Sequence, residues 1–129
     1  MTTRSTTLLA MRPEISSARV HDGMNAEEQF QNASLRPILK FQHDLLLAVF
    51  RKYMLQKKVA FAKLTKPQKI QHIDQVFFRD HRFKNLLKGV VLGQFTMEEY
   101  ECYLENASAL NKRMFSMMKK RFLDSLTEL

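Results

Sequence analysis

Histidine and cysteine side chains are the groups in this chain that could hold a metal ion. A zinc site takes three or four such ligands at short, recognisable spacings. There is one cysteine, and the histidines lie on separate segments with no pair four residues apart: His21, His43, His72 and His81. A ferritin-like di-iron bundle needs a glutamate three residues before an inward-facing histidine, and no histidine here has one. We therefore expect no metal and no cofactor.

Nucleophilic and acid–base catalysis have equally little support in the residue pattern. Cys102 lies near the start of a predicted helix, but Glu98, Glu101 and Glu105 surround it and oppose formation of the thiolate. These glutamates could form a paired-carboxylate site, although a solvated helix face is the simpler interpretation. Phosphate-binding loops need a cluster of glycines, and the three glycines of this chain are scattered. The pattern leans against an enzyme and predicts no catalytic residue.

Basic side chains are a stronger functional signal. The chain of 129 residues has a formal net charge of +8, and residues 61–95 hold seven Lys or Arg against two Asp. Such an excess attracts polyanions, and the predicted polyanion-binding residues are Lys66, Lys69, Arg79, Arg82 and Lys88. The two helices that carry them could form a helix-turn-helix, but the second is too apolar to present a broad polar face to DNA. The excess either binds nucleic acid weakly and without sequence preference or is only a solvated basic face, and the second interpretation is the simpler one.

A methionine-rich stripe near the C-terminus is the second candidate surface. It consists of Met114, Phe115, Met117, Met118 and Phe122, and five basic residues flank it. Because methionine adapts to varied shapes, the stripe is predicted to contact a protein partner. Neighbouring side chains on a helix point about 100° apart, so a single core interface is not expected to bury both members of the adjacent pairs 114–115 and 117–118. The alternative is that the stripe belongs to the core.

The elements that carry these residues are predicted to be helices. Three glycines and three prolines are few for this length, and few turns mean long helices. Apolar residues recur at helical spacing, which predicts an all-α, single-domain four-helix bundle over residues 25–129. Residues 1–24 show no sustained period and are predicted to be a flexible or loosely docked N-terminal arm. The bundle helices are predicted at residues 34–57, 65–78, 80–92 and 96–124, with the third in the centre of the bundle.

Local start signals support these helices. Thr65 with Gln68, and Thr96 with Glu99, have the spacing of capping boxes. Asn25 is predicted to cap a short helical turn, Ser34 the first long helix and Asp80 the third. Gly93 stands in the position where a helix commonly ends.

The segment Phe-Thr-Met-Glu-Glu-Tyr at residues 95–100 and the segment Leu-Asn-Lys-Arg at 110–113 resemble a family of small uncharacterised bacterial proteins. The similarity extends from Arg-Pro-Glu-Ile at residues 12–15 through Leu-Arg-Pro-Ile-Leu at 35–39 to the last helix. Some relatives carry the label glyoxalase. That label implies a metal-dependent fold of strand-rich units with histidine and glutamate ligands, and this sequence has neither the strands nor the ligand spacing.

We expect a non-catalytic binding or adaptor module that contacts a protein or a polyanion through its basic side. The alternatives are an enzyme of glyoxalase type and a helix-turn-helix-like nucleic-acid binder. A single cysteine favours a reducing compartment, so the expected location is cytoplasmic. No apolar run approaches the roughly 18 residues of a membrane span. Partner identity and self-association stay open.

Overall fold

The computed structural model describes residues 2–16 and 19–129, and over these ranges the chain is helical with no strand. The predicted all-α class is confirmed. In chain order the elements are α1 (Thr3–Met11), α2 (Ala26–Phe30), the π-helix η2 (Gln31–Leu35), α3 (Arg36–Phe41), α4 (His43–Gln56), the 3₁₀-helix η3 (Phe61–Lys63), α5 (Lys66–Arg79), α6 (His81–Leu92), α7 (Met97–Glu105), α8 (Ala107–Asp124) and the 3₁₀-helix η4 (Leu126–Glu128).

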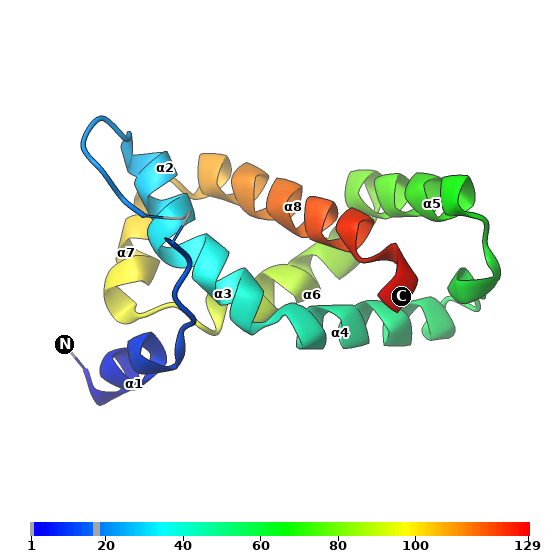
Figure 1. Ribbon diagram of the computed structural model, residues 1–129, viewed down its shortest axis with the longest axis horizontal. Coiled ribbons are helices and arrows are strands. Elements are labelled where there is room, and N and C mark those ends of the chain that lie inside the picture. The colour runs from blue at the N-terminus through cyan, green and yellow to red at the C-terminus, as the bar shows by residue number, and fades with distance from the viewer. Residues whose placement is uncertain (1, 17–18) are drawn as a thin grey trace.

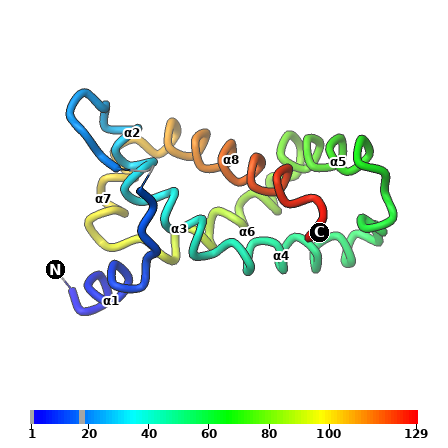
Figure 2. The backbone as a smooth tube through the Cα atoms, viewed as in Figure 1, coloured from blue at the N-terminus to red at the C-terminus, as the bar shows by residue number. Residues whose placement is uncertain are grey.

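The molecule is elongated, with α4 and α8 along its length (Figure 1). The short helices α1, α2 and α7 gather at one end, and the turn from α4 through η3 to α5 forms the other (Figure 2). The α6 helix contacts α4, α5 and α8. Distant parts of the sequence also meet, because η2, in the first third of the chain, lies against α8, in the last third.

Several helix starts follow the sequence rules. Thr65 and Thr96 form complete capping boxes with Gln68 and Glu99. The Asp80 carboxylate accepts a hydrogen bond from the Phe83 N–H at the start of α6. These predictions are confirmed because a capping box needs residues only three positions apart.

The predicted cap at Ser34 is wrong. Asn25 caps α2, and the chain stays helical from there until Gln42. Ser34 is buried inside the π-helix η2, where the Arg36 N–H bonds to the carbonyl of Gln31, five residues earlier. Pro37 follows directly, and it lacks the N–H that an α-helix would use. The wide π-turn thus lies directly before the residue that cannot donate a helical hydrogen bond.

The predicted helix over residues 96–124 is divided at Asn106, whose φ of −143° and ψ of 38° are not helical. Asparagine competes for its own backbone and is a frequent helix boundary. The Asn106 side chain donates a hydrogen bond to the carboxylate of Glu27, a residue 79 positions earlier in the chain. The break lets α7 turn away while α8 continues along the body.

Phe50 is the centre of the core. Its ring lies 5.1 Å from Phe61, 6.0 Å from Phe83 and 5.1 Å from Phe122, measured between centroids. Helices α4, α6 and α8 each supply one of these fully buried rings. The predicted central position of α6 is not what the structure has, because one face is buried while Leu86, on another face, is half exposed.

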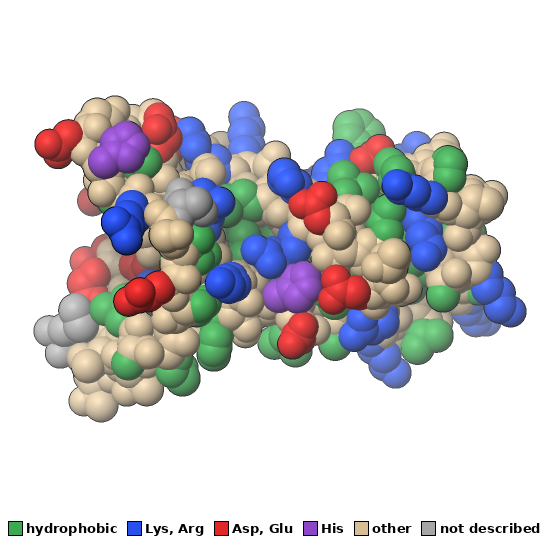
Figure 3. All heavy atoms as spheres, viewed as in Figure 1, with side chains coloured by type: hydrophobic (Ala, Val, Ile, Leu, Met, Phe, Trp, Pro, Cys, Tyr) green, Lys and Arg blue, Asp and Glu red, His purple; other side chains and the backbone are tan. Residues whose placement is uncertain are grey.

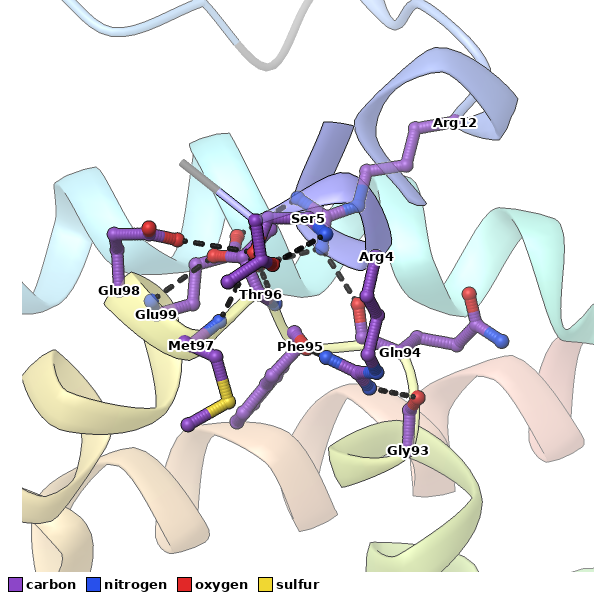
Figure 4. A network of polar contacts seen from close by, with 11 residues as sticks. Arg4, Ser5, Arg12, Gly93, Gln94, Phe95, Thr96, Met97, Glu98 and Glu99 are labelled. Atoms are coloured by element: carbon purple, nitrogen blue, oxygen red, sulfur yellow. Dashed lines mark hydrogen bonds and ion pairs between the residues drawn. The ribbon is translucent and has the colours of Figure 1, made fainter. Parts of the chain in front are cut away.

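The predicted flexible or loosely docked arm contains a helix, α1, that is docked on the body. Arg12 forms a bidentate ion pair with Glu99, at 2.5 and 2.7 Å, and also donates to the carbonyl of Gln94 (Figure 4). Arg4 donates to the carbonyls of Gly93 and Phe95 (Figure 4). The α1 helix is held mainly by these polar contacts, which a hydrophobic periodicity in the sequence does not reveal. Residues 1, 17 and 18 of the predicted arm lie outside the described part of the chain.

Candidate basic groove between the third and eighth helices

A groove runs between α8 on one side and the η2–α3 segment on the other. It consists of two adjoining hollows, of about 640 and 410 Å³, that share Gln31, Met117 and Lys120. Leu39 and Met117 supply apolar floor. Six basic side chains line it: Arg36, Lys40, Lys112, Arg113, Lys120 and Arg121. In the middle of this face both basic and acidic side chains lie beside a histidine (Figure 3).

The groove keeps a positive excess after its ion pairs are formed. Arg113 pairs with Glu27 at 3.2 Å, and Lys120 pairs with Asp124 at 2.8 Å. A third carboxylate, that of Glu128, lies 3.6 Å from His43. Six cations against three carboxylates leave three formal positive charges, with the histidine counted as neutral. Lys40 and Lys112 are exposed on opposite walls, and nothing else in the described chain forms an ion pair with either.

His43 is held between a cation and an anion. The Arg121 guanidinium lies 3.2 Å from its Nδ1. Because a guanidinium has no acceptor, Nδ1 must accept, and the ring proton is on Nε2, toward Glu128. Burial lowers the pKa of Arg121, which Asp124 opposes. Arginine stays charged at neutral pH regardless, so this half-buried guanidinium is a fixed positive group in the groove wall.

The π-helix η2 positions one wall. Its first residue, Gln31, accepts a hydrogen bond from Arg113 at 2.7 Å and so fixes that guanidinium across the groove. The wide turn carries the chain directly into Arg36 and α3. Single π-turns inside helices frequently occur at functional sites because they redirect side chains.

The arrangement is suited to holding an anion rather than to transforming a substrate. Its titratable groups besides the cations are His43 and three carboxylates, and all of these already have partners. In the described residues no group of three histidine, cysteine or acidic side chains could hold a metal ion. Cys102 and Glu101 are exposed on α7, away from the residues that line the groove.

The five residues predicted to bind a polyanion do not share one surface, although Lys66 and Lys69 line a common hollow. Lys66 and Arg79 lie near opposite ends of α5, about 20 Å apart at the rise of an α-helix. The Lys69 ammonium is 3.4 Å from the Leu126 carbonyl. Arg82 and Lys88 lie on α6.

The connection between α5 and α6 does not support a helix-turn-helix. That motif uses a turn of three or four residues, whereas here Asp80 alone separates the helices. The Tyr53 hydroxyl also donates a hydrogen bond to the Asp80 carboxylate. The joint between α5 and α6 is therefore anchored to α4.

The methionine-rich stripe is largely core, and the predicted partner surface needs correction. Met114, Met118 and Phe122 are buried, because their spacing of four residues turns them all inward. Met117 is partly buried and lines the basic groove. Phe115 is also partly buried, with the Lys84 ammonium 4.9 Å from its ring. Three of the five residues are thus closed to a partner.

Sequence reasoning missed this groove because its walls are some 70 to 80 residues apart in the chain. One signal was present. From residue 106 to residue 123 there is no acidic residue, while this stretch holds five Lys or Arg. The α3 wall, with Arg36 and Lys40, had no comparable excess to mark it.

Comparison with protein-family models, characterised proteins and solved structures finds no match to this chain. The resemblance to the glyoxalase-labelled family stays a prediction. Among the described residues no helix has the length and apolar character to cross a membrane.

Proposed function

We propose that this protein is a non-catalytic binding module that takes a phosphate-bearing polyanion in the groove between α3 and α8. The observation that carries the proposal is the convergence of six basic side chains from two distant segments on two adjoining hollows. A concave basic surface concentrates field and ligand more than scattered surface lysines do. Three of these cations are arginines, which bind phosphate oxygens in a bidentate manner.

The lining favours recognition of phosphates over recognition of bases. Modules that read single-stranded nucleic acid stack bases on aromatic side chains, and the residues that line this groove include no aromatic ring other than His43. Contacts limited to phosphates carry no sequence information. Binding is therefore expected to be independent of sequence and strongly dependent on salt.

The expected strength follows from the net charge of the groove. Its six cations exceed the three carboxylates beside them by three formal charges. With about −0.7 in the slope of log affinity against log salt for each phosphate neutralised on a single strand, three such contacts give a slope of about −2. Affinity should be micromolar or weaker at physiological salt.

A pair of double variants with equal charge change tests the location. The groove variant, Lys40→Glu with Lys112→Glu, reverses one charge on each wall of the groove. The α5 variant, Lys66→Glu with Arg79→Glu, reverses two exposed charges on α5. Fluorescence anisotropy of a labelled single-stranded oligonucleotide at several salt concentrations measures both. We expect the groove variant to lose tenfold or more in affinity and the α5 variant less than about threefold. Equal losses would show that only net charge matters and would overturn the proposal.

We infer that α4, α5, α6 and α8 act together as the bundle domain, supported by the aromatic cluster around Phe50. A reducing, cytoplasmic setting is supported by the single cysteine of the chain.

A further inference from the structure

An apolar pocket of about 310 Å³ lies where α4 ends, beside η3. Its walls include Phe50, Met54, Val59, Phe61 and Leu129, and its lining is almost wholly apolar. This volume is at the lower end of the range typical for sites that hold small molecules. None of its lining residues belongs to the basic groove.

Backbone hydrogen bonds at the end of α4 build this pocket. The Val59 N–H bonds to the Met54 carbonyl at 2.9 Å, and the Lys58 N–H bonds to the Leu55 carbonyl at 3.0 Å. Together they form a Schellman motif, with Lys58 in the left-handed conformation at a φ of 58°. The motif turns the chain sharply into η3 and sets Val59 opposite Met54. The pocket is thus a product of the fold and needs no ligand to shape it.

The mouth of the pocket is basic. Arg51 and Lys63 are among the residues that line it, and Lys57 and Lys58 lie in the turn beside it. Between residues 45 and 73 the chain has no Asp or Glu. Arg51 donates to the backbone carbonyl of Glu128 at 2.6 Å, which keeps its guanidinium at the rim. The Glu128 carboxylate is 3.6 Å from His43.

From this combination we infer that the pocket binds the hydrocarbon chain of an anionic amphiphile, with the negative head beside Lys63 and Arg51. The apolar walls take the chain because moving methylene groups out of water into an apolar environment is favourable. The basic side chains at the rim, Arg51 and Lys63, favour a negative head over a neutral or positive one. Leu55, which also lines the pocket, is 70% exposed and extends the apolar surface outward. The ligand chemistry is an acyl chain with a carboxylate or phosphate head, either free or in a bilayer.

Binding of decanoate below its micelle concentration, measured by titration calorimetry, tests the pocket. We expect saturable binding at one site per chain. Ala62→Trp places a large ring on an exposed pocket-lining position and should weaken binding tenfold or more. Ala48→Trp is the matched control, since it is exposed on α4 outside the pocket, and should change affinity less than twofold. Equal affinities in the two variants would overturn the inference.

Head-group selectivity is tested separately. Lys63→Glu should weaken decanoate binding at least threefold and leave decanol binding unchanged, because only the charged head faces the rim. Decyltrimethylammonium should bind more weakly than decanoate to the unaltered chain. Equal binding of the cationic and anionic amphiphiles would contradict the proposed role of the rim.

The source of the acyl chain is identified with vesicles of phosphatidylglycerol or phosphatidylcholine in a sedimentation assay. Decanoate binding without vesicle binding assigns a free amphiphile. Sedimentation with phosphatidylglycerol that Ala62→Trp reduces and Ala48→Trp does not assigns a bilayer lipid. If decanoate does not bind and Ala62→Trp leaves sedimentation unchanged, the pocket has no such ligand and the inference fails.

Discussion

Lys58 is the one residue other than glycine with a positive φ in the described ranges, and it terminates α4. A side chain in the left-handed region is strained, and glycine is the residue most often found there. We predict that Lys58→Gly stabilises the protein by about 0.5–1 kcal/mol, measured by urea unfolding. Lys57→Gly is the control, because Lys57 has a φ of −84°, and it should destabilise. Loss of stability in Lys58→Gly would show that the side chain has another role.

The Arg12–Glu99 pair is the most buried ion pair found in the described chain, with side-chain exposures of 7% and 14%. Removing one partner of a buried pair leaves an uncompensated charge and costs about 3 kcal/mol or more. We predict such a loss for Arg12→Ala in thermal or urea unfolding. Arg113→Ala breaks a pair in which both side chains are about a third exposed, and it should cost about 1 kcal/mol or less. Similar costs would show that α1 is weakly docked.

Glu99 also makes this contact dependent on pH. Burial opposes its ionisation, but hydrogen bonds from Arg12 and Ser34 outweigh burial and hold its pKa below the usual value. The stabilisation is therefore present above the ordinary glutamate pKa of about 4.3 and is lost as pH falls through the lower folded value. We predict that the stability difference between the unaltered chain and Arg12→Ala narrows below about pH 4. A difference that persists in strong acid would contradict an ionic contact.

The stabilisation that Tyr53 contributes depends on pH in the opposite direction. Burial, and then the hydrogen bond to Asp80, raise the pKa of Tyr53 to about 12. Folding favours the neutral phenol, so its stabilisation is present below about pH 10, the ordinary value, and is lost as pH rises toward 12. We predict that one of the three tyrosines ionises near pH 12 in an ultraviolet absorbance titration and that Tyr53→Phe removes this component. Its persistence in the variant would assign it to another tyrosine.

At the scale of elements, α1 fastens the loop between α6 and α7. The Ser5 hydroxyl donates to Glu98 and accepts from the Met97 N–H, and Arg4 holds the carbonyls of Gly93 and Phe95 (Figure 4). We predict that deleting residues 1–12 lowers the melting temperature measured by circular dichroism at least as much as Arg12→Ala does. A truncated chain that melts like the full one would show that α1 adds no stability and would support the prediction of a flexible or loosely docked arm.

Helix boundaries differ in how far sequence could place them. Thr65 and Thr96 were placed correctly because both partners of a capping box lie within one turn. The π-turn over η2 and the break at Asn106 were missed because the contacts that accompany them are distant. Arg113 bonds to Gln31, and Asn106 bonds to Glu27.

At the scale of the whole molecule, the groove should link anion binding to stability. A ligand that binds the folded state alone stabilises it by about 2.7 kcal/mol at a hundred times its dissociation constant. We predict that sodium tripolyphosphate raises the melting temperature at low salt and that about 0.5 M sodium chloride abolishes the effect by screening. Sodium chloride of equal ionic strength is the control. An unchanged shift in Lys40→Glu with Lys112→Glu would place the anion elsewhere.

The sequence by itself determined the helical class, the capped starts of α5, α6 and α7, and the basic character of the chain. These depend on composition and on residues a few positions apart. The tertiary structure alone decided which basic residues share a surface and which methionines are buried. Lys40 and Lys112 face one groove because η2, which continues into α3, packs against α8, whereas Lys66 and Arg79 are separated by the length of α5. Charge can be counted along a chain, but a binding site depends on contacts between distant segments, which periodicity does not encode.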